Sequence, residues 1–281
     1  MLFKTSDNVE INYEVTGKGK TIVLVNGFGA YQETWSAQVP FLNKLGYQVL
    51  TYDHRNMGKS QRTEKGHTIE RLTQDLNELT SFLKIKQAIF MGHSMGASII
   101  FCLMKNNPKL VKQALLIDQS PKMLNDENWK YGFMDYTKEN YLKKCQERPR
   151  VHETYNGLDD NVYAKLMKAK KANPFNRKDN VDLLENHMSL DWRRVLEKTT
   201  IPTTFFVAEE VLFNQSQFDT FSVCNNKIYW KPSVFFCNGH QGQKQTGSSR
   251  ISYKVWYDGS KPVFVVFHDI PVVFKFDSII V

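Results

Sequence analysis

Short apolar runs alternate with stretches of helical periodicity along the chain. The apolar runs are rich in β-branched and aromatic residues and cover residues 21–25, 47–53, 88–91, 114–118 and 203–208. Their nearly continuous apolar character is typical of strands buried on both faces, as in a parallel sheet. Residues 35–45 and 69–83 have helical spacing, the second behind Thr68 as a candidate N-cap. The pattern predicts a doubly wound α/β fold.

The alternation stops between about residues 122 and 195. This stretch is long and polar with helix-compatible spacing, and apolar residues such as Trp129, Phe133 and Met167 lie within it. We interpret it as a helical cap inserted between two strands and expect it to gate an apolar pocket. The expected organisation is an N-terminal core over 1–121, the cap over 122–195, and the C-terminal core with a β-rich tail over 196–281.

The composition changes after Glu210. No glutamate follows it, and 14 of the last 71 residues are aromatic, against 22 of the first 210. Residues 251–267 predict a hairpin around Asp258 and Gly259, followed by another β-like run. Two interpretations stay open: a β extension of the fold, or a frameshifted end that folds poorly.

Composition and charge exclude several classes of protein. The 281 residues are 41% hydrophobic and 23% charged, with a net charge of +8. There is no apolar run of membrane-spanning length and no leader-like start, so we expect a soluble, cytoplasmic protein without a membrane span. The lysines are spread along the chain, which argues against nucleic-acid binding. The four cysteines lack metal-ligand spacing, so neither a bound metal nor a disulfide is expected.

The segment Gly92-His93-Ser94-Met95-Gly96 carries the clearest chemical signal. A serine between two glycines, after a strand and before a helix, is the pattern of a nucleophile on a tight strand-to-helix turn. The glycines are required because such a turn leaves no room for Cβ atoms beside the nucleophile. We therefore predict Ser94 as a nucleophile.

A second turn, Asn-Gly-Phe-Gly at residues 26–29, ends an early strand. Attack by a serine on a carbonyl creates an oxyanion, which needs two preorganised backbone N–H donors. The candidate donors are the amide of Phe28 in this turn and the amide of Met95 directly after the serine.

These segments, with the Asp-x-Arg-x-x-Gly-x-Ser pattern that starts at Asp53, resemble the α/β-hydrolase family, specifically small bacterial esterases and non-haem haloperoxidases. The resemblance covers residues 1 to about 218. It implies an α/β-hydrolase fold, hydrolysis by a serine, acid and histidine triad, no cofactor, and a supporting role for the Asp53 pattern. The chain departs from the family at Asn26, where a histidine is usual, at Val211, where many relatives have the triad aspartate, and throughout the tail.

The acid and the base of the triad are less well defined. The Val211 side chain cannot accept a hydrogen bond from an imidazole, so another residue must be the acid. The candidates are Asp118, after the preceding strand, and Glu210 or its neighbour Glu209; we favour Asp118. In the family's order the base follows the serine and the acid, which leaves His240 and His268. We favour His240, because a glycine-rich loop surrounds it, with His268 as the alternative.

Two functions remain from these observations. The first is a serine hydrolase of the carboxylesterase type that acts on small esters through an acyl-enzyme. The alternative is a catalytically weak ligand-binding or signalling protein on the same fold, in which no histidine reaches Ser94.

Overall fold

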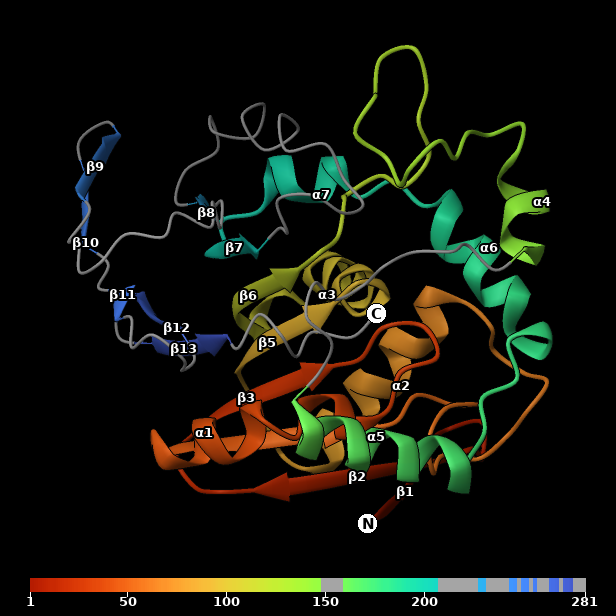
Figure 1. Cartoon of the computed structure of the whole chain (residues 1–281), viewed down its shortest axis with the longest axis horizontal. Helices are drawn as coiled ribbons and strands as arrows, with labels where there is room; N and C mark the ends of the chain where they lie inside the picture. The colour runs from red at the N-terminus through yellow and green to blue at the C-terminus, as the bar shows by residue number, and fades with distance from the viewer. Residues whose placement is uncertain are drawn as a thin grey trace.

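The structure is a computed structural model. It describes residues 1–147 and 159–206 in full, and beyond residue 206 the backbone of six short strands. Its central feature is an eight-stranded sheet in the order β1-β2-β4-β3-β5-β6-β7-β8 (Figure 1). The strands are β1 (Leu2–Lys4), β2 (Glu10–Thr16), β3 (Lys20–Val25), β4 (Tyr47–Tyr52), β5 (Ala88–His93), β6 (Val111–Ile117), β7 (Thr203–Phe206) and β8 (Lys227–Trp230).

Strands β3 to β8 are parallel to one another, whereas β2 pairs with β4 in the antiparallel sense and β1 pairs with β2 in the same way. All five predicted strands are present. The parallel strands end at a common edge of the sheet, and the loops that follow them therefore meet there, which is where such sheets bind ligands.

Helices cover both faces of the sheet. Alternate residues of β3 point to opposite faces, so that Val23 and Val25 pack with helices α2 (Ile69–Phe82) and α3 (Met95–Asn106). Ile22 and Leu24 pack on the other face, with α1 (Gln38–Lys44) and the 3₁₀ turn η1 (Gln32–Trp35). A second 3₁₀ turn, η2 (Pro108–Leu110), leads into β6.

The predicted start of α2 is confirmed. The Thr68 hydroxyl accepts a hydrogen bond from the Arg71 amide at 3.1 Å, as an N-cap residue should. Phe82, which shares the apolar spacing of this helix, lies at its last turn and is 56% exposed. Its ring packs on Phe3 of β1, with ring centroids 5.1 Å apart, instead of entering the core.

In the segment between β6 and β7 helices begin only at Tyr141, and residues 118–140, where the sequence predicts the start of a helical cap, consist of turns and isolated bridges. The segment holds α4 (Tyr141–Gln146), α5 (Asp160–Ala172), the 3₁₀ turn η3 (Lys178–Asn180), α6 (Val181–Ser189) and α7 (Arg193–Lys198). Met123, Tyr136, Leu184 and Met188 form a small apolar cluster of their own in this segment. None of the helices in the described ranges combines the length and the apolar character needed to cross a membrane.

Beyond β8, the described strands of the tail form two small sheets. Strand β9 (Gln243–Thr246) pairs with β10 (Ser249–Ser252). Strands β11 (Val255–Trp256), β12 (Val263–Phe267) and β13 (Ile270–Phe274) form a three-stranded antiparallel sheet. The pairing of β11 with β12 agrees with the predicted hairpin, but six residues connect the two strands, so the connection is longer than a two-residue turn at Asp258 and Gly259.

Candidate active site

Ser94 occupies the sharp turn between β5 and α3. Its backbone has φ 50° and ψ −123°, a strained conformation for a residue with a side chain. The Ser94 amide donates to the carbonyl of Ile117 on β6 at 2.9 Å, which fixes the turn against the neighbouring strand. The residue is half-buried, so the turn presents it at the edge of the sheet where the parallel strands end.

The two flanking glycines are required by close packing. A Cβ on Gly96 would lie 2.3 Å from the carbonyl oxygen of Val25, and a Cβ on Gly92 would lie 2.7 Å from the backbone of Gly96. Both distances are far below van der Waals contact. The start of α3 therefore packs directly on the end of β3, as the sequence predicts for this turn.

The loop after β3, residues 26–31, lies beside Ser94, and we call it the oxyanion loop. A Cβ on Gly27 would be 3.4 Å from the Cβ of Ser94. The Phe28 amide follows Gly27, and the Met95 amide begins α3 immediately after Ser94. The structure thus brings the backbone around both candidate oxyanion donors to Ser94.

A distant part of the chain packs on the oxyanion loop. Phe175, which follows α5, stacks edge-on against Phe28 with ring centroids 5.1 Å apart, and a Cβ on Gly29 would lie 2.9 Å from its ring. The Tyr31 hydroxyl donates to the Asn173 carbonyl at 2.9 Å. Nothing in the local sequence around Phe175 signals this contact, which joins residues more than 140 positions apart.

The base of the oxyanion loop is held by Asn26, the residue that departs from the family pattern. Its side-chain amide donates to the Tyr52 carbonyl at 3.1 Å, and its own carbonyl accepts from Nε2 of His54 at 2.9 Å. Burial lowers the pKa of His54, so the ring is neutral and carries its proton on Nε2. These bonds join the ends of β3 and β4.

Asp53 lies buried directly after β4 and accepts hydrogen bonds from several parts of the chain. Its carboxylate accepts hydrogen bonds from the backbone and side-chain amides of Gln32, both at 3.0 Å, from the Asn12 side chain at 3.1 Å and from the Lys59 amide at 3.0 Å. Because Gln32 immediately follows the oxyanion loop, Asp53 anchors the end of that loop to the core. This agrees with the supporting role that the resemblance implies.

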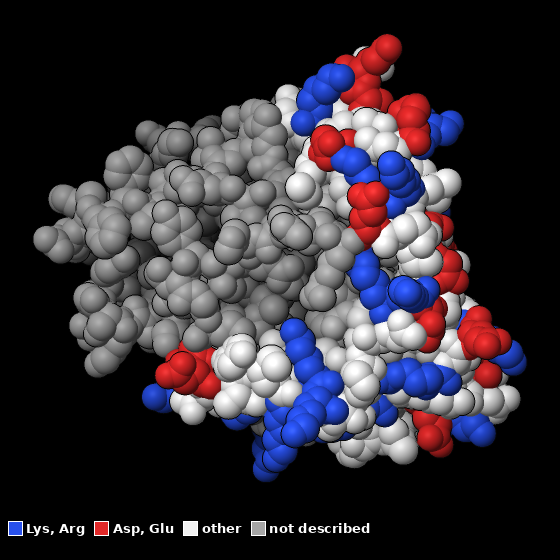
Figure 2. Space-filling view, turned by 45° about the vertical axis from the view of Figure 1, so that its right-hand side comes forward, with Lys and Arg blue, Asp and Glu red and all other residues white. Residues whose placement is uncertain are grey.

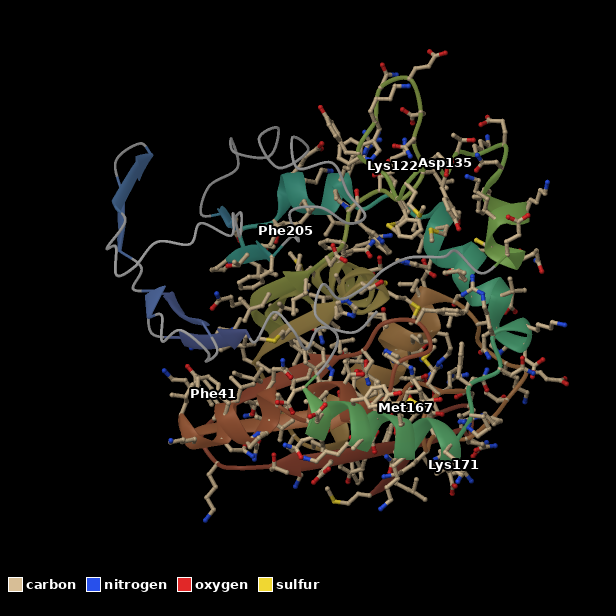
Figure 3. The ribbon with its side chains drawn as sticks, viewed as in Figure 1. Phe41, Lys122, Asp135, Met167, Lys171 and Phe205 are labelled. Atoms are coloured by element: carbon tan, nitrogen blue, oxygen red, sulfur yellow. The ribbon has the colours of Figure 1, made fainter. Side chains whose placement is uncertain are left out.

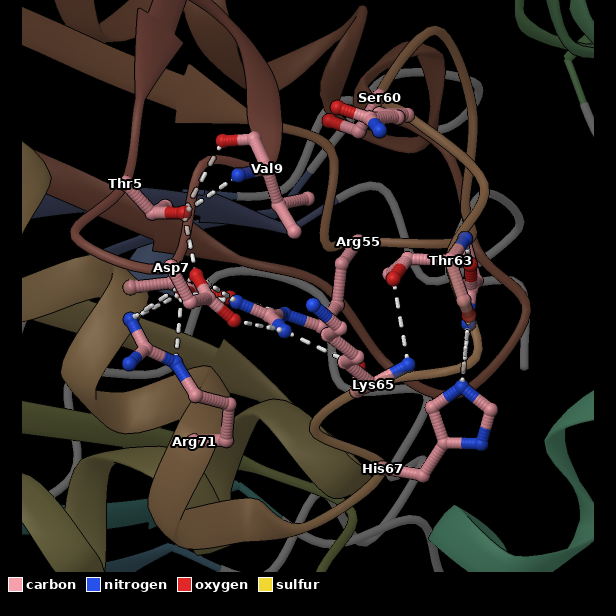
Figure 4. Close-up of polar contacts among 12 residues, drawn as sticks. Thr5, Asp7, Val9, Arg55, Ser60, Thr63, Lys65, His67 and Arg71 are labelled. Carbon is pink, nitrogen blue, oxygen red and sulfur yellow. Dashed lines mark hydrogen bonds and ion pairs between the residues drawn. The ribbon is translucent and has the colours of Figure 1, made fainter.

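Arg55, from the same pattern, lies at the centre of a buried ion-pair network (Figure 4). Its guanidinium donates to both carboxylate oxygens of Asp75 at 2.7 Å and reaches Asp7 at 2.9 Å. Arg71 also binds Asp75, at 2.7 Å. Hydrogen bonding to Arg55 holds the pKa of Asp7 well below its usual range. The network joins the β1–β2 turn, the loop after β4 and helix α2.

His67 connects the core to the segment between β6 and β7. Its Nδ1 lies 2.7 Å from the carboxylate of Asp182 on α6, and the Asn186 side chain of the same helix accepts from the Ile69 amide at 2.9 Å. His67 thus makes a contact that ties the core to α6.

Asp118 follows β6 at the same edge of the sheet as Ser94. It comes directly after Ile117, whose carbonyl binds the Ser94 amide, and its own amide donates to Phe206 of β7 at 2.8 Å. Its backbone is left-handed, with φ 49°. None of the helices in the described part of the chain begins at Asp118, so its carboxylate does not serve as a helix N-cap there.

The alternative acids Glu209 and Glu210, together with Val211, His240 and His268, lie outside the described residues. Strand β8, which is described, pairs with β7 in parallel. The carboxyl ends of β7 and β8 therefore lie at the same edge of the sheet as Ser94 and Asp118. Among the described residues, no group of His, Cys, Asp or Glu side chains is arranged to hold a metal ion.

Comparisons with known proteins agree with this architecture. Residues 20–142 match the family described as alpha/beta hydrolase fold. An esterase from Exiguobacterium antarcticum superimposes with a TM-score of 0.68 at 17% identity, covering 82% of this chain and 89% of the esterase. The chain has the α/β-hydrolase fold, and residues 20–142 match the model of that family.

Two curated proteins illustrate the named activities of the sequences that resemble this chain. An sn-1-specific diacylglycerol lipase from Danio rerio is 28% identical over 198 residues, 69% of this chain and 60% of the lipase. A non-heme chloroperoxidase from Burkholderia pyrrocinia is 29% identical over 130 residues, 44% of this chain and 47% of that protein. The chain spans about half the length of the curated relatives that it matches.

Proposed function

We propose that this protein is a serine hydrolase that cleaves small carboxylic esters through an acyl-enzyme on Ser94. The observation that carries the proposal is the backbone of Ser94, which is held at φ 50° in the turn from β5 to α3, beside Gly27 of the oxyanion loop. Such strain persists where the surrounding structure enforces it, and it is characteristic of functional sites. The esterases and lipases among the similar proteins support this class of reaction.

In the proposed mechanism the Ser94 hydroxyl attacks the ester carbonyl while His240 accepts its proton. The resulting oxyanion accepts hydrogen bonds from the Phe28 and Met95 amides. The tetrahedral intermediate collapses, and the alcohol departs with the proton from His240. Water, activated by His240, then hydrolyses the acyl-enzyme and restores Ser94 with release of the acid.

Asp118 is the proposed acid that orients His240. It is supported by its place at the end of β6, one residue beyond the carbonyl that binds the Ser94 amide. Glu210 remains the alternative. His240 is supported by the parallel direction of β8, because the chain after Trp230 leaves the sheet at the edge that carries Ser94. His268 remains the alternative base.

Residues 122–195 are the proposed cap over this edge. The support is the contact between the oxyanion loop and the residues after α5, where Phe175 packs on Phe28 and Gly29. A substrate bound beside Ser94 would meet these aromatic rings. Met167 is not part of that wall, because it lies on the side of α5 opposite Leu166 and Ala169, which contact Tyr31.

The first experiment is labelling of the purified protein with a fluorophosphonate, which reacts only with an activated serine. The wild type is expected to be labelled and to hydrolyse p-nitrophenyl esters, and Ser94→Ala is expected to lose labelling and about 10⁴-fold or more in kcat. Ser98→Ala, one turn further along α3, is the matched control and keeps both. Equal labelling of the wild type and Ser94→Ala, or no labelling of the wild type, would overturn the proposal.

A second set of variants assigns the partners of Ser94. Asp118→Asn and His240→Ala should each lower kcat strongly, whereas Glu210→Gln and His268→Ala should not. The activity of the wild type should rise with pH through the pKa of a histidine near neutrality, because His240 acts from its neutral form. Loss of activity in Glu210→Gln but not in Asp118→Asn would transfer the acid to Glu210.

A further inference from the structure

Helix α5 carries a concentration of positive charge that the proposed reaction does not use. The helix, Asp160–Ala172, contains four lysines and one acidic residue, Asp160, in its first turn. The lysines are Lys165, Lys168, Lys170 and Lys171, and all four are exposed. Figure 2 shows a broad group of basic side chains along the lower part of the molecule, at the height at which Figure 1 places α5.

The buried side of α5 is small and fully used. Val162, Leu166 and Ala169 are buried, and the last two pack on Tyr31. These positions recur at helical spacing, so they define one face, and the remaining residues of the helix are exposed. The helix is therefore anchored to the core by one narrow stripe.

The opposite face combines apolar and basic side chains. Tyr163, Met167 and Lys171 follow one another at intervals of four and share this face, with Lys168 beside them. Tyr163 is 53% and Met167 is 43% exposed, and Figure 3 shows Met167 and Lys171 on the same helix. Exposed apolar side chains surrounded by lysines on one helix face are the arrangement of helices that lie in a membrane interface.

We propose that the outer face of α5 docks this protein on an anionic lipid bilayer. The lysines contact acidic headgroups, and Tyr163 and Met167 enter the boundary between headgroups and acyl chains. Tyr163 and Met167 favour a bilayer over a soluble polyanion. Both ligands attract the lysines, but only a bilayer offers an apolar region in which these two side chains are removed from water. A hydrolase held on a bilayer in this way would meet esters that dissolve in lipid.

The test is co-sedimentation of the full chain with vesicles of phosphatidylcholine alone or with about one third phosphatidylserine. Wild type should sediment with the anionic vesicles only, and added salt should weaken the binding. Lys168→Gln with Lys171→Gln should lower the partition coefficient roughly 25-fold, since each lysine near an anionic surface contributes about fivefold. The matched control is Lys109→Gln with Lys112→Gln, two exposed lysines near the start of β6, which should bind like wild type.

The apolar contribution is tested at constant charge. Tyr163→Ser with Met167→Ser should lower partitioning about tenfold or more, while binding to an anionic oligonucleotide stays unchanged. Ser94→Ala should partition like wild type, so failure of the proposed catalysis does not affect this measurement. Equal partitioning of wild type into neutral and anionic vesicles, or a loss with the lysine variant but none with the apolar variant, would overturn the bilayer proposal.

Discussion

Mild acid is expected to destabilise this protein through histidines that are buried in their neutral form. His93, beside Ser94, and His187, on α6, are 1% and 2% exposed, and burial lowers the pKa of each from 6.5 to about 4. Both nitrogens of His93 and Nδ1 of His187 have no hydrogen-bond partner among the described residues. Protonation of either ring in the folded state would thus place an uncompensated charge in the interior.

The direction and the size of this loss of stability follow from the difference between the histidine pKa values in the folded and unfolded states. Because the folded pKa is lowered, the unfolded chain binds protons first as the pH falls below about 6.5, and stability is lost between that pH and about 4. Between pH 7 and pH 5.5 each histidine removes about 1.2 kcal/mol of the free energy of unfolding, and the two together about 2.5 kcal/mol. Carboxylates contribute little in this window, because their unfolded pKa values lie near 4.

The assay is urea unfolding at pH 7 and pH 5.5, followed by circular dichroism. The variant His187→Leu removes one titrating group, so its loss of stability between the two pH values should be smaller than that of wild type by about 1.2 kcal/mol. Met188→Leu, a substitution at a neighbouring buried position of α6, is the control and should lose as much as wild type. If His187→Leu and wild type lose the same amount, His187 is not buried in the neutral form.

Three further substitutions test the framework around Ser94. Gly58→Ala should destabilise by about 3 kcal/mol by urea unfolding, because Gly58 has φ 49° and a Cβ would lie 2.2 Å from the Asp53 carboxyl carbon. Arg55→Leu should cost about 3–5 kcal/mol in the same assay, since it removes the bidentate partner of buried Asp75. Phe175→Ala should lower kcat for a p-nitrophenyl ester about tenfold with little change in KM, because it releases the oxyanion loop.

Each of these predictions has a matched control. Gly46→Ala shares the positive φ, 82°, but its Cβ would meet no atom within 4 Å, so it should cost only about 1 kcal/mol. Arg193→Leu removes a half-exposed ion pair with Asp191 and should cost less than about 1 kcal/mol. Phe175→Leu should keep most of the activity. Equal losses in a variant and its control would contradict the corresponding argument.

The strands and the turn at Ser94 could be predicted because local sequence determines them. Apolar runs define the strands, and the glycines at 92 and 96 are required by contacts within a few residues or with the adjacent strand. The partners of Asp53 could not be predicted in this way. They come from Asn12, Gln32 and Lys59, which the fold brings together from β2, η1 and the loop after β4.

The acid and the base of the proposed triad illustrate the same limit. Asp118 could be predicted as a candidate because it directly ends an apolar strand, and the structure places it beside the turn of Ser94. His240 lies ten residues beyond the end of β8, and no periodic pattern connects the two. The position of a side chain so far from a strand depends on long-range contacts, which a single sequence does not encode locally.

The oxyanion loop is held from two sides, and this couples the cap segment to the proposed chemistry. On the core side, Asp53 binds the amide of Gln32, immediately after the loop. On the other side, the ring of Phe175 packs against Phe28 and Gly29, and Tyr31 is bonded to the chain that follows α5. The core contact consists of hydrogen bonds to the Asp53 carboxylate, whereas the contact from the cap side consists of aromatic packing and the Tyr31 hydrogen bond. Substitution of Phe175 therefore removes support for the Phe28 amide from the cap side while the Asp53 contacts are retained.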